Sequence, residues 1–427
     1  MQQIKLDWQE PLNFAQKVSD NYDKSSWVFL YCGLNKSIKN SISQIALFPQ
    51  EKILCDDFFA AEKIIRSSAK KWFGYFSYEV GQQFENLPKT EKSFISLPKI
   101  WLINFGLILN FNHDLKDLTA DFIDENLLQK ALGWNEKPAK ITTIKVSFFD
   151  SNFTDKSYLE AISAIKKQIS VGDFYQTNLT RKFFGKFNKK LSPQENFQLF
   201  LDLTKLSPAN YSSFLKLDEN YVISSSPELF LKIKNKKIIS RPIKGTVARG
   251  ENFSQDKKNK SYLKNSPKER SENLMIVDLV RNDFARICEA GSVVVKKLFK
   301  ISAYKNIFHM SSEVHGKIAK NFDALDALKT CFPAGSMTGA PKIKAVSIAA
   351  NLEKLDRGIY SGAIGSFSKK EVNSAVVIRT LITSGEKFEF QTGGGITFDS
   401  DEKSELQETF NKAKSLCEIL GIKSQVD

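Results

Sequence analysis

The stretch Arg241-Pro242-Ile243-Lys244-Gly245-Thr246 decides how this chain is interpreted, because it places a lysine where a strand-forming run is interrupted. Residues 228–239 favour a strand, and Pro242 and Gly245 then predict a bend around Lys244. Desolvation, or a cationic neighbour such as Arg241, would favour the neutral and nucleophilic amine of a lysine held at such a bend. Because the chain has 62 lysines and arginines, a solvated surface lysine is the alternative, and the surroundings of Lys244 must decide.

The composition predicts a globular protein. A length of 427 residues allows one large or two ordinary domains, and 42% hydrophobic residues support a substantial core. The formal net charge is +14, but the lysines are scattered, and the densest groups lie at 232–237 and 257–260. We interpret both groups as solvated loops, because no aromatic side chains alternate with them and no nucleic-acid-binding motif is present. A nucleic-acid partner is therefore not expected.

The cysteines and the apolar segments predict a soluble cytoplasmic protein without a membrane partner. Five cysteines lie far apart, with no metal-ligand spacing, which indicates reduced thiols and no zinc site. Residues 1–8 lack the apolar core of a signal peptide. The most apolar stretch, 94–111, is interrupted by Pro98, Lys99 and Asn104, and it predicts paired strands rather than a membrane span.

The pattern of apolar residues along the chain changes near Ser151. Residues 1 to about 145 contain aromatic and β-branched runs typical of strands. After Ser151, apolar residues recur at helical spacing from Tyr158 to Ile169, and Gly172 predicts the end of that helix. Helices and strands then mix to the end of the chain. Without a repeat or a low-complexity linker, the two parts are expected to pack as one body.

Two predicted helices each carry a pair of glutamates on one face. The first begins at Ser266, with proline at the next position and the form of a capping box, and runs to about Glu289 with Glu269 and Glu272. The other runs from about Ser404 to Leu420 with Glu405 and Glu408. Four carboxylates from two helices suit Mg²⁺. The alternative is that they are exposed glutamates, with Glu269 serving only the capping box.

Two glycine-containing segments could bind an anion. The loop 332–342 places backbone amides before a helix predicted to begin at Pro341, which suits a carboxylate, but its spacing differs from that of a phosphate-binding loop. The run Gly393-Gly394-Gly395 would allow a ligand to approach the backbone, or it would form a tight turn or bulge before the last helix.

Two other polar residues stand in apolar surroundings. His309 follows a mixed apolar segment, where a histidine is more often packed than catalytic. Arg379 interrupts an apolar strand and would need an anionic partner if buried, so it is either a carboxylate clamp or half of a structural salt bridge.

Taken in order, seven motifs resemble those of the chorismate-utilising enzymes, the family that includes anthranilate synthase component I. The motifs are Ser226-Pro227-Glu228-Leu229, residues 242–246, residues 278–283, residues 332–336, residues 339–342, residues 360–365 and Gly393-Gly394-Gly395. The resemblance implies a chorismate-binding catalytic domain over 151–417, with a divergent region, 1–145, packed on it. It further implies an α+β fold, in which an α/β sandwich of large antiparallel sheets flanked by helices surrounds a central cleft, and a requirement for Mg²⁺.

Lys244 favours one branch of this family. The anthranilate and isochorismate lineages usually have alanine at this position, whereas aminodeoxychorismate synthase component I has this lysine. The resemblance implies that Lys244 attacks ring carbon 2 of chorismate while the hydroxyl on carbon 4 leaves, with Glu228 as the general acid/base. Ammonia then enters at carbon 4 and expels the lysine. The product would be 4-amino-4-deoxychorismate, used for para-aminobenzoate and folate synthesis.

The same resemblance assigns the remaining residues. Glu272 and Glu408 would ligate Mg²⁺, and Glu269 and Glu405 would support its waters. The expected substrate-binding residues are Thr246, His309, Ser336, Tyr360, Arg379, Gly394, Gly395 and Lys412.

Three further expectations concern partners and rival functions. The chain lacks a Gly-x-Cys-x-Gly nucleophile motif, so a separate glutamine amidotransferase subunit would supply the ammonia. It also lacks the Leu-Leu-Glu-Ser element that binds tryptophan in anthranilate synthases, so tryptophan inhibition is not predicted. The rival functions are anthranilate synthase component I, which releases pyruvate, and a non-catalytic chorismate-binding subunit.

Overall fold

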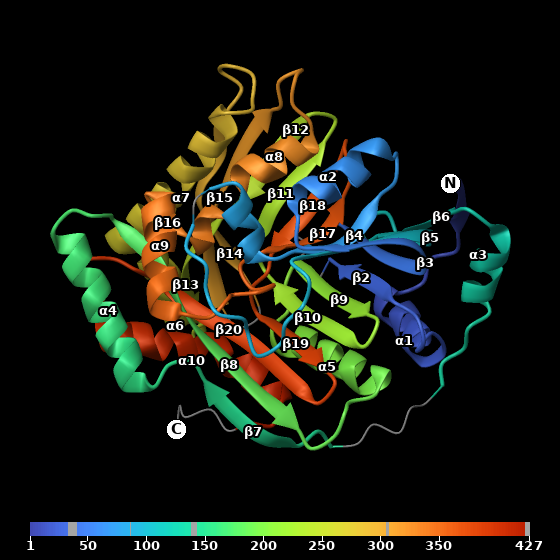
Figure 1. The fold of residues 1–427 in the computed structure, drawn as a ribbon, viewed down its shortest axis with the longest axis horizontal. Helices are drawn as coiled ribbons and strands as arrows, with labels where there is room; N and C mark the ends of the chain where they lie inside the picture. Colours follow the sequence, from blue (N-terminus) through green and yellow to red (C-terminus); the bar gives the residue numbers. More distant parts are fainter. Residues whose placement is uncertain (33–40, 86, 138–142, 305–306, 423–427) are drawn as a thin grey trace.

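The structure, a computed structural model, describes residues 1–32, 41–85, 87–137, 143–304 and 307–422. Its strands join into one continuous sheet with helices around it (Figure 1), and every ladder between named strands is antiparallel in the chain so described. This arrangement confirms the predicted α+β class, in which a large antiparallel sheet is flanked by helices. The strands are β1 (Gln2–Leu6), β2 (Trp27–Tyr31), β3 (Ile42–Cys55), β4 (Trp72–Phe76), β5 (Ile100–Asn112), β6 (Asp117–Phe122), β7 (Val146–Ser151), β8 (Gln176–Phe187), β9 (Tyr211–Leu217), β10 (Asn220–Ser226), β11 (Leu229–Lys234), β12 (Lys237–Arg241), β13 (Ile243–Ala248), β14 (Val294–Ala303), β15 (Ile307–Lys317), β16 (Gly339–Ala340), β17 (Ala363–Phe367), β18 (Val372–Val376), β19 (Thr380–Ser384) and β20 (Lys387–Ile396).

Strand β5 connects the two halves of the sheet. Its residues 100–104 pair with β4, its residues 107–112 pair with β6, and β3 runs along its length. From β4 the ladder continues through β17, β18, β11 and β12 to β15, which also pairs with β13 and β14. From β3 it continues through β2, β9, β10, β19 and β20 to β8. The N-terminal strands therefore extend the same sheet as the strands that carry the motifs.

Most of the helices pack on the sheet through apolar faces (Figure 1). The helices are α1 (Pro11–Asn21), α2 (Phe58–Ser67), α3 (Glu125–Leu132), α4 (Asp155–Ser170), α5 (Pro193–Leu206), α6 (Phe253–Asn265), α7 (Pro267–Ala285), α8 (Ala324–Cys331), α9 (Lys342–Glu353) and α10 (Glu402–Ile419), with 3-10 turns η1 (Tyr78–Gln83) and η2 (Gly335–Met337). Helix α7 buries Val277 and Phe284, and α10 buries Leu416, in separate parts of the core. Burying each such side chain stabilises the fold by about 1.5–3 kcal/mol. These anchors fix which helical faces remain for the glutamates.

The predicted helices are present, with one difference at the start of α7. The Ser266 hydroxyl accepts a hydrogen bond from the Glu269 amide, as predicted. The capping box also predicts that the Glu269 side chain accepts a hydrogen bond from the Ser266 amide. This prediction is wrong, because the Ser266 amide donates to the Tyr262 carbonyl at the end of α6. The helix also ends at Ala285, earlier than predicted. The carboxylate of Glu269 is therefore free for another role.

Three other predictions of local structure are wrong. Residues 94–111 do not form paired strands, because their strand part lies in the single strand β5. Residues 228–239 do form strands, as predicted, in the hairpin β11–β12, but Lys232, Lys234 and Lys237 therefore lie in strands and not in a loop. Lys257 to Lys260 lie on α6, not in a loop. Lysine is itself a good helix former and Asn252 caps the helix, even though this helix has almost no apolar face. No helix in the described ranges is long and apolar enough to cross a membrane.

Candidate active site

Lys244 lies where β13 departs from regular pairing. The register with β15 shifts between Ile243 and Thr246, and Gly245 adopts φ +90°, a conformation that favours glycine. The Lys244 amine reaches across to β20, where a methyl group added to Gly395 would come within 3.2 Å of Nζ. The sequence correctly placed this lysine at a bend, and the structure shows that the bend is a bulge within a strand.

Arg241 does not act on Lys244 as expected. Its guanidinium pairs with Glu313 at 2.8 Å and donates to the Tyr211 hydroxyl at 3.0 Å. The charged groups that Lys244 does influence are carboxylates, because its ammonium lowers the pKa values of Glu228 and Glu272 against the effect of burial. The expected cationic neighbour is thus replaced by acids.

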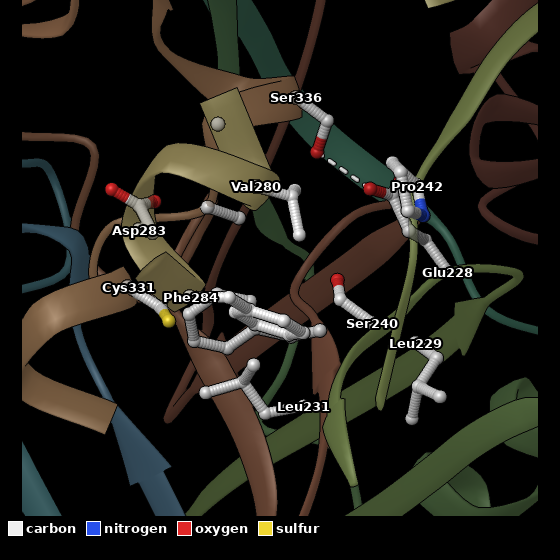
Figure 2. Close-up of a pocket in the computed structure, with 13 residues that line it drawn as sticks. Glu228, Leu229, Leu231, Ser240, Pro242, Val280, Asp283, Phe284, Cys331 and Ser336 are labelled. Atoms are coloured by element: carbon white, nitrogen blue, oxygen red, sulfur yellow. Dashed lines mark hydrogen bonds between the residues drawn. The ribbon is translucent and has the colours of Figure 1, made fainter. Parts of the chain in front are cut away.

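Glu228 is a buried carboxyl group beside Lys244. It follows β10, and only 4% of its surface is exposed. The Ser336 hydroxyl, held by the turn η2, donates a 2.5 Å hydrogen bond to it (Figure 2). Burial raises the pKa of Glu228 to about 7, although Ser336 and Lys244 oppose that rise. A carboxyl group with this pKa can both donate and accept a proton near neutral pH.

The four glutamates of α7 and α10 gather near Gly245 and Gly394. A methyl group added to Gly394 would lie 2.9 Å from Glu405 and 3.6 Å from Glu408, and one added to Gly245 would lie 2.8 Å from Glu269. Burial and the neighbouring negative charges raise the pKa values of Glu269, Glu272 and Glu405. The two predicted pairs therefore lie close enough for the charge of each to act on the other.

Two lysines accompany these glutamates. Lys412, one turn after Glu408, contacts its carboxylate at 2.5 Å and donates to the Gly393 carbonyl at 2.7 Å. That ammonium is the main reason why the pKa of Glu408 is lowered. Lys268 lies 3.7 Å from Glu405. Each helix thus brings one cation to the acidic group.

The donor chemistry of this group fits Mg²⁺. No three acidic, histidine or cysteine side chains among the described residues converge closely enough to enclose a metal ion. Mg²⁺ does not need such an enclosure, because it keeps several waters and takes one or two carboxylates together with an anionic substrate. Burial, and after it the repulsion between neighbouring carboxylates, raises the pKa values of Glu269, Glu272 and Glu405, and a divalent cation would relieve that repulsion.

Thr246 and His309 form a pair at the side of the cleft. They are opposite in the β13–β15 register, and Thr246 Oγ1 lies 2.8 Å from His309 Nδ1. His309 is 3% exposed, burial moves its pKa well below the usual value, and its Nε2 has no hydrogen-bond partner within the described chain. A neutral imidazole with a free ring nitrogen can bind a polar group of a ligand.

Arg379 and Tyr360 belong to the loops beside β18. Arg379 has φ +51° and donates to the Ser207 hydroxyl at 3.2 Å, and no carboxylate of the described residues forms an ion pair with it. Burial lowers its pKa. Tyr360 is 6% exposed, and burial raises the pKa of its hydroxyl. Since an unpaired and partly buried guanidinium attracts an anion, Arg379 has the properties predicted for a carboxylate clamp.

The glycine run is not the tight turn or bulge that is the alternative to a ligand-binding backbone, and the loop 332–342 is not an open anion-binding loop. Gly393, Gly394 and Gly395 do not form a turn; they lie inside β20 and pair in regular register with β8. In the loop, the amides of Met337 and Thr338 donate to carbonyls of the same turn, so the contact it makes with the site is Ser336. The glycines keep the floor of the cleft free of side chains.

Gln176 is a residue of the site that sequence reasoning missed. It is 1% exposed, and its amide nitrogen would be 2.0 Å from a methyl group on Gly395. Its Oε1 atom finds no partner in the described part of the chain. A glutamine in the strand-forming run of β8 gave no sequence signal, because only the pairing of β8 with β20 brings it beside Lys244.

Comparison with known proteins agrees with this geometry. The chorismate binding enzyme family matches residues 20–418. The chain belongs to this family. Aminodeoxychorismate synthase component 1 of Klebsiella aerogenes is 36% identical over 80% of this chain and 75% of the relative, and that of Escherichia coli strain K12 is 35% identical over 81% and 76%. The predicted family and the prediction of a chorismate-utilising enzyme are therefore confirmed.

Relatives from another branch are also similar. Anthranilate synthase component 1 of Aquifex aeolicus is 38% identical over 64% of this chain and 54% of the relative. The crystal structure of anthranilate synthase component I from Streptococcus pneumoniae TIGR4 superimposes with a TM-score of 0.78 at 26% identity, covering 90% of this chain and 93% of that one. The family therefore leaves more than one reaction open.

Proposed function

We propose that this chain is the chorismate-converting component of an aminodeoxychorismate synthase. The observation that carries the proposal is the position of Lys244, whose amine lies over the glycine floor of the cleft, in the electrostatic reach of the buried acid Glu228. In the rival anthranilate and isochorismate branches this position is usually alanine. A lysine at this point can form a covalent bond to the substrate ring.

The proposed reaction has two substitutions. First, Lys244 loses its ammonium proton to solvent, and the neutral amine bonds to ring carbon 2. The ring double bonds shift, the bond from carbon 4 to oxygen breaks, and the hydroxyl leaves as water with a proton from Glu228. The proton lost by the attacking nitrogen returns to Glu228. Ammonia then bonds to carbon 4, the ring double bonds shift back, and the bond between carbon 2 and Nζ breaks. A proton from the incoming nitrogen passes through Glu228 to Nζ, which regenerates the free amine of Lys244. The sum converts chorismate and ammonia into 4-amino-4-deoxychorismate and water.

The other site residues would bind and orient the substrate. Arg379 and Tyr360 would hold the enolpyruvyl carboxylate, and Thr246, His309 and Gly395 would line the ring. Glu272 and Glu408 would hold Mg²⁺, with Glu269 and Glu405 orienting its waters. When bound, Mg²⁺ supplies positive charge for the second carboxylate of chorismate.

The ammonia is proposed to come from a glutamine amidotransferase subunit. The relatives are named component 1, which supports a second component. Anthranilate synthase component I is the second candidate function, favoured by the similarity to relatives of that name. The two reactions differ in whether pyruvate leaves the ring.

Mass spectrometry of products would separate these functions. The purified chain is incubated with chorismate, Mg²⁺ and ammonium, with and without an enzymatic pyruvate trap. We expect a product that keeps the enolpyruvyl group, and a transient adduct on Lys244 equal to chorismate less one water. Lys244→Ala should make neither, except that excess ammonia can restore product without the adduct. Lys237→Ala, at an exposed lysine of β12, is the matched control. Anthranilate together with pyruvate would contradict the proposal.

A further inference from the structure

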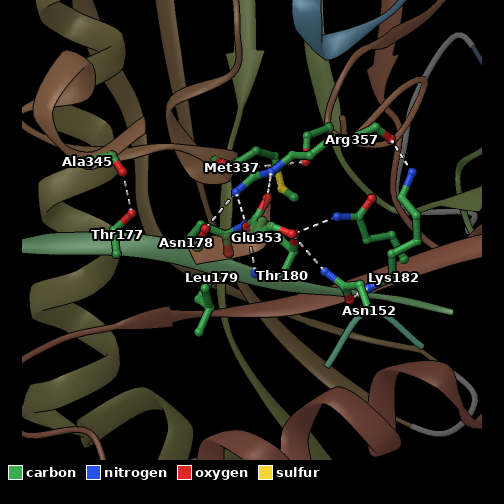
Figure 3. A network of polar contacts seen from close by, with 12 residues as sticks. Asn152, Thr177, Asn178, Leu179, Thr180, Lys182, Met337, Ala345, Glu353 and Arg357 are labelled. Atoms are coloured by element: carbon green, nitrogen blue, oxygen red, sulfur yellow. Dashed lines mark hydrogen bonds and ion pairs between the residues drawn. The ribbon is translucent and has the colours of Figure 1, made fainter. Parts of the chain in front are cut away.

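A buried arginine outside the cleft uses every donor that it has. Arg357 is 3% exposed, and its guanidinium makes five hydrogen bonds. Two go to the Glu353 carboxylate at 2.8 Å each, and others go to the Met337 carbonyl at 2.8 Å, the Asn178 carbonyl at 2.7 Å and the Ser361 hydroxyl at 3.4 Å (Figure 3). A guanidinium has five N–H groups, so none is left unused.

These bonds fasten the turn η2 to strand β8. The Asn178 amide donates to the Thr338 carbonyl at 2.8 Å, and Gly339 pairs with Thr177. Arg357 adds a second connection, because it bonds the carbonyls of both Met337 and Asn178. Ser336, the residue that donates to Glu228, directly precedes Met337. The path from Arg357 to the proposed acid therefore passes through one turn.

The N-terminal region holds Arg357 from its other side. The Glu79 carboxylate accepts hydrogen bonds from the amides of Arg357 at 2.8 Å and of Gly358 at 3.1 Å. The Tyr78 ring stacks on the guanidinium with 4.6 Å to the ring centroid. Glu79 is itself buried, and burial raises its pKa to about 7. The arginine is thus fixed between η1, α9 and β8.

Burying a charged guanidinium and a carboxylate costs free energy unless their hydrogen bonds compensate for the lost water. A buried ion pair is often no more stabilising than apolar residues of the same volume. Losing the arginine, however, would leave the Met337 and Asn178 carbonyls without their donor in the protein interior. The feature that distinguishes Arg357 from a simple ion pair with Glu353 is this bridging of two backbone segments, one of which belongs to the active site.

We propose that Arg357 is a positioning residue for the reaction: it fixes the turn η2 so that the Ser336 hydroxyl donates to Glu228. The inference rests on the proposed role of Glu228, and it extends that role to a network partly supplied by the N-terminal region. Arg357 itself does not contact the substrate cleft through any of its five hydrogen bonds.

The Ser336 bond has a measurable effect on Glu228. The groups that act on this carboxyl are Ser336 from η2, Lys244 from β13, Lys412 from α10 and the Ile243 amide. The negative charge of Glu228 in turn contributes to raising the pKa of the Tyr360 hydroxyl. Each of the first four favours the charged carboxylate, and Ser336 has the largest effect among them. Loss of the Ser336 bond should therefore move the titration of Glu228 upward from about 7.

The experiment measures this titration without turnover. Isotope-edited infrared spectra of protein labelled in the glutamate carboxyl groups are recorded against pH, and the Glu228 band is the one absent in Glu228→Gln. Ser336→Ala should raise the midpoint by about 1 pH unit, the size expected for one hydrogen bond to a charged group. Arg357→Gln should raise it by a similar amount, and the double variant should raise it no further.

Two additional variants keep the test decisive. Arg357→Lys retains the buried charge, so it should fold where Arg357→Gln does not, and it should still raise the midpoint because lysine cannot bridge both carbonyls. Arg181→Gln is the control: Arg181 is 6% exposed on the same strand β8, but it bonds Ser151 and Asp155, away from η2. It should leave the midpoint unchanged.

The outcomes separate this inference from the proposed function. A midpoint that does not move in the Arg357 variants, or shifts that add in the double variant, would overturn the positioning role. A midpoint unmoved in Ser336→Ala would overturn it as well. The proposed reaction is judged independently by product mass and by Lys244→Ala, so it can stand or fail without changing the infrared result.

Discussion

Two groups of carboxylates lie around Lys244, and they differ in the number of acids and cations that surround them. Glu228 is a single acid on the sheet side, 4% exposed, with the Ser336 hydroxyl as its hydrogen-bonding side chain. The glutamates on α7 and α10 form a group of four, and lysines on the same two helices contact Glu405 and Glu408.

The difference shows how surroundings divide roles between chemically identical groups. An isolated buried carboxyl gains a proton near pH 7, because burial penalises its charge and few cations compensate. In the cluster, burial also raises the pKa values of Glu269, Glu272 and Glu405, but Lys412 lowers the pKa of Glu408, so that this carboxylate keeps its negative charge. One side of the cleft is suited to moving a proton, and the other to holding positive charge.

The largest expected effect is on catalysis through the isolated acid. Glu228→Gln should lower kcat by about 10²- to 10⁴-fold, the usual contribution of a general acid. Wild-type kcat should fall as the pH rises through about 7, because the protonated carboxyl is lost, and the residual rate of the variant should not show this decline. Rates measured from pH 5.5 to 8.5 test this. A decline that persists in Glu228→Gln would assign it to another group.

The same substitution should stabilise the fold at high pH. Because the folded-state pKa of Glu228 is raised from 4.5 to about 7, the native protein binds this proton more tightly than the unfolded chain, and stability falls as the pH rises between those values. Removing the group should therefore increase the free energy of unfolding at pH 8, relative to pH 5, by at most about 3 kcal/mol. Urea unfolding at both pH values measures it. Glu353→Gln, which breaks a buried ion pair, should destabilise at both.

On the clustered side the expected effect is on metal affinity. Glu272→Gln and Glu408→Gln should weaken binding of Mg²⁺, or of Mn²⁺ as its spectroscopic substitute, more than Glu405→Gln does. Glu405→Gln should lower the metal affinity on the order of tenfold, as is usual when a residue that supports the metal ligands is lost. Electron paramagnetic resonance of Mn²⁺ reports this without turnover. Glu228→Gln should bind the metal normally, and equal losses in all four variants would remove the distinction between the two sides.

Much of this comparison could be predicted from the sequence. The i, i+3 spacing placed Glu269 and Glu272 on one face of α7, and a helix start predicted from local capping lies within a residue of the observed one. Pro242 and Gly245 likewise located the irregularity that carries Lys244. These features depend on neighbours a few residues away, and such neighbours are visible in the chain.

Other features depend on contacts that no local pattern contains. Arg357 lies in a loop, yet it is buried because Asn178, 179 residues earlier, accepts its hydrogen bond. Gln176 meets Gly395 only through the β8–β20 ladder. The lysine-rich segment of α6 is helical although the sequence predicts a loop there, and a helix that is polar on all sides lacks the periodicity by which helices are recognised.

The smallest expected effect is an increase in metal affinity, whereas the substitutions in the cluster of glutamates should lower it. Lys268 is about half exposed and lies 3.7 Å from Glu405, so Lys268→Gln should change the free energy of unfolding by less than about 1 kcal/mol. If the four glutamates act as one cation-binding group, removing this ammonium should tighten Mn²⁺ binding by roughly two- to threefold, because less positive charge competes. Lys264→Gln, at an exposed lysine of α6, should leave the affinity unchanged. Weaker binding in Lys268→Gln would mean that the lysine organises the site, and the cluster would then resemble a structural salt-bridge network rather than a metal site.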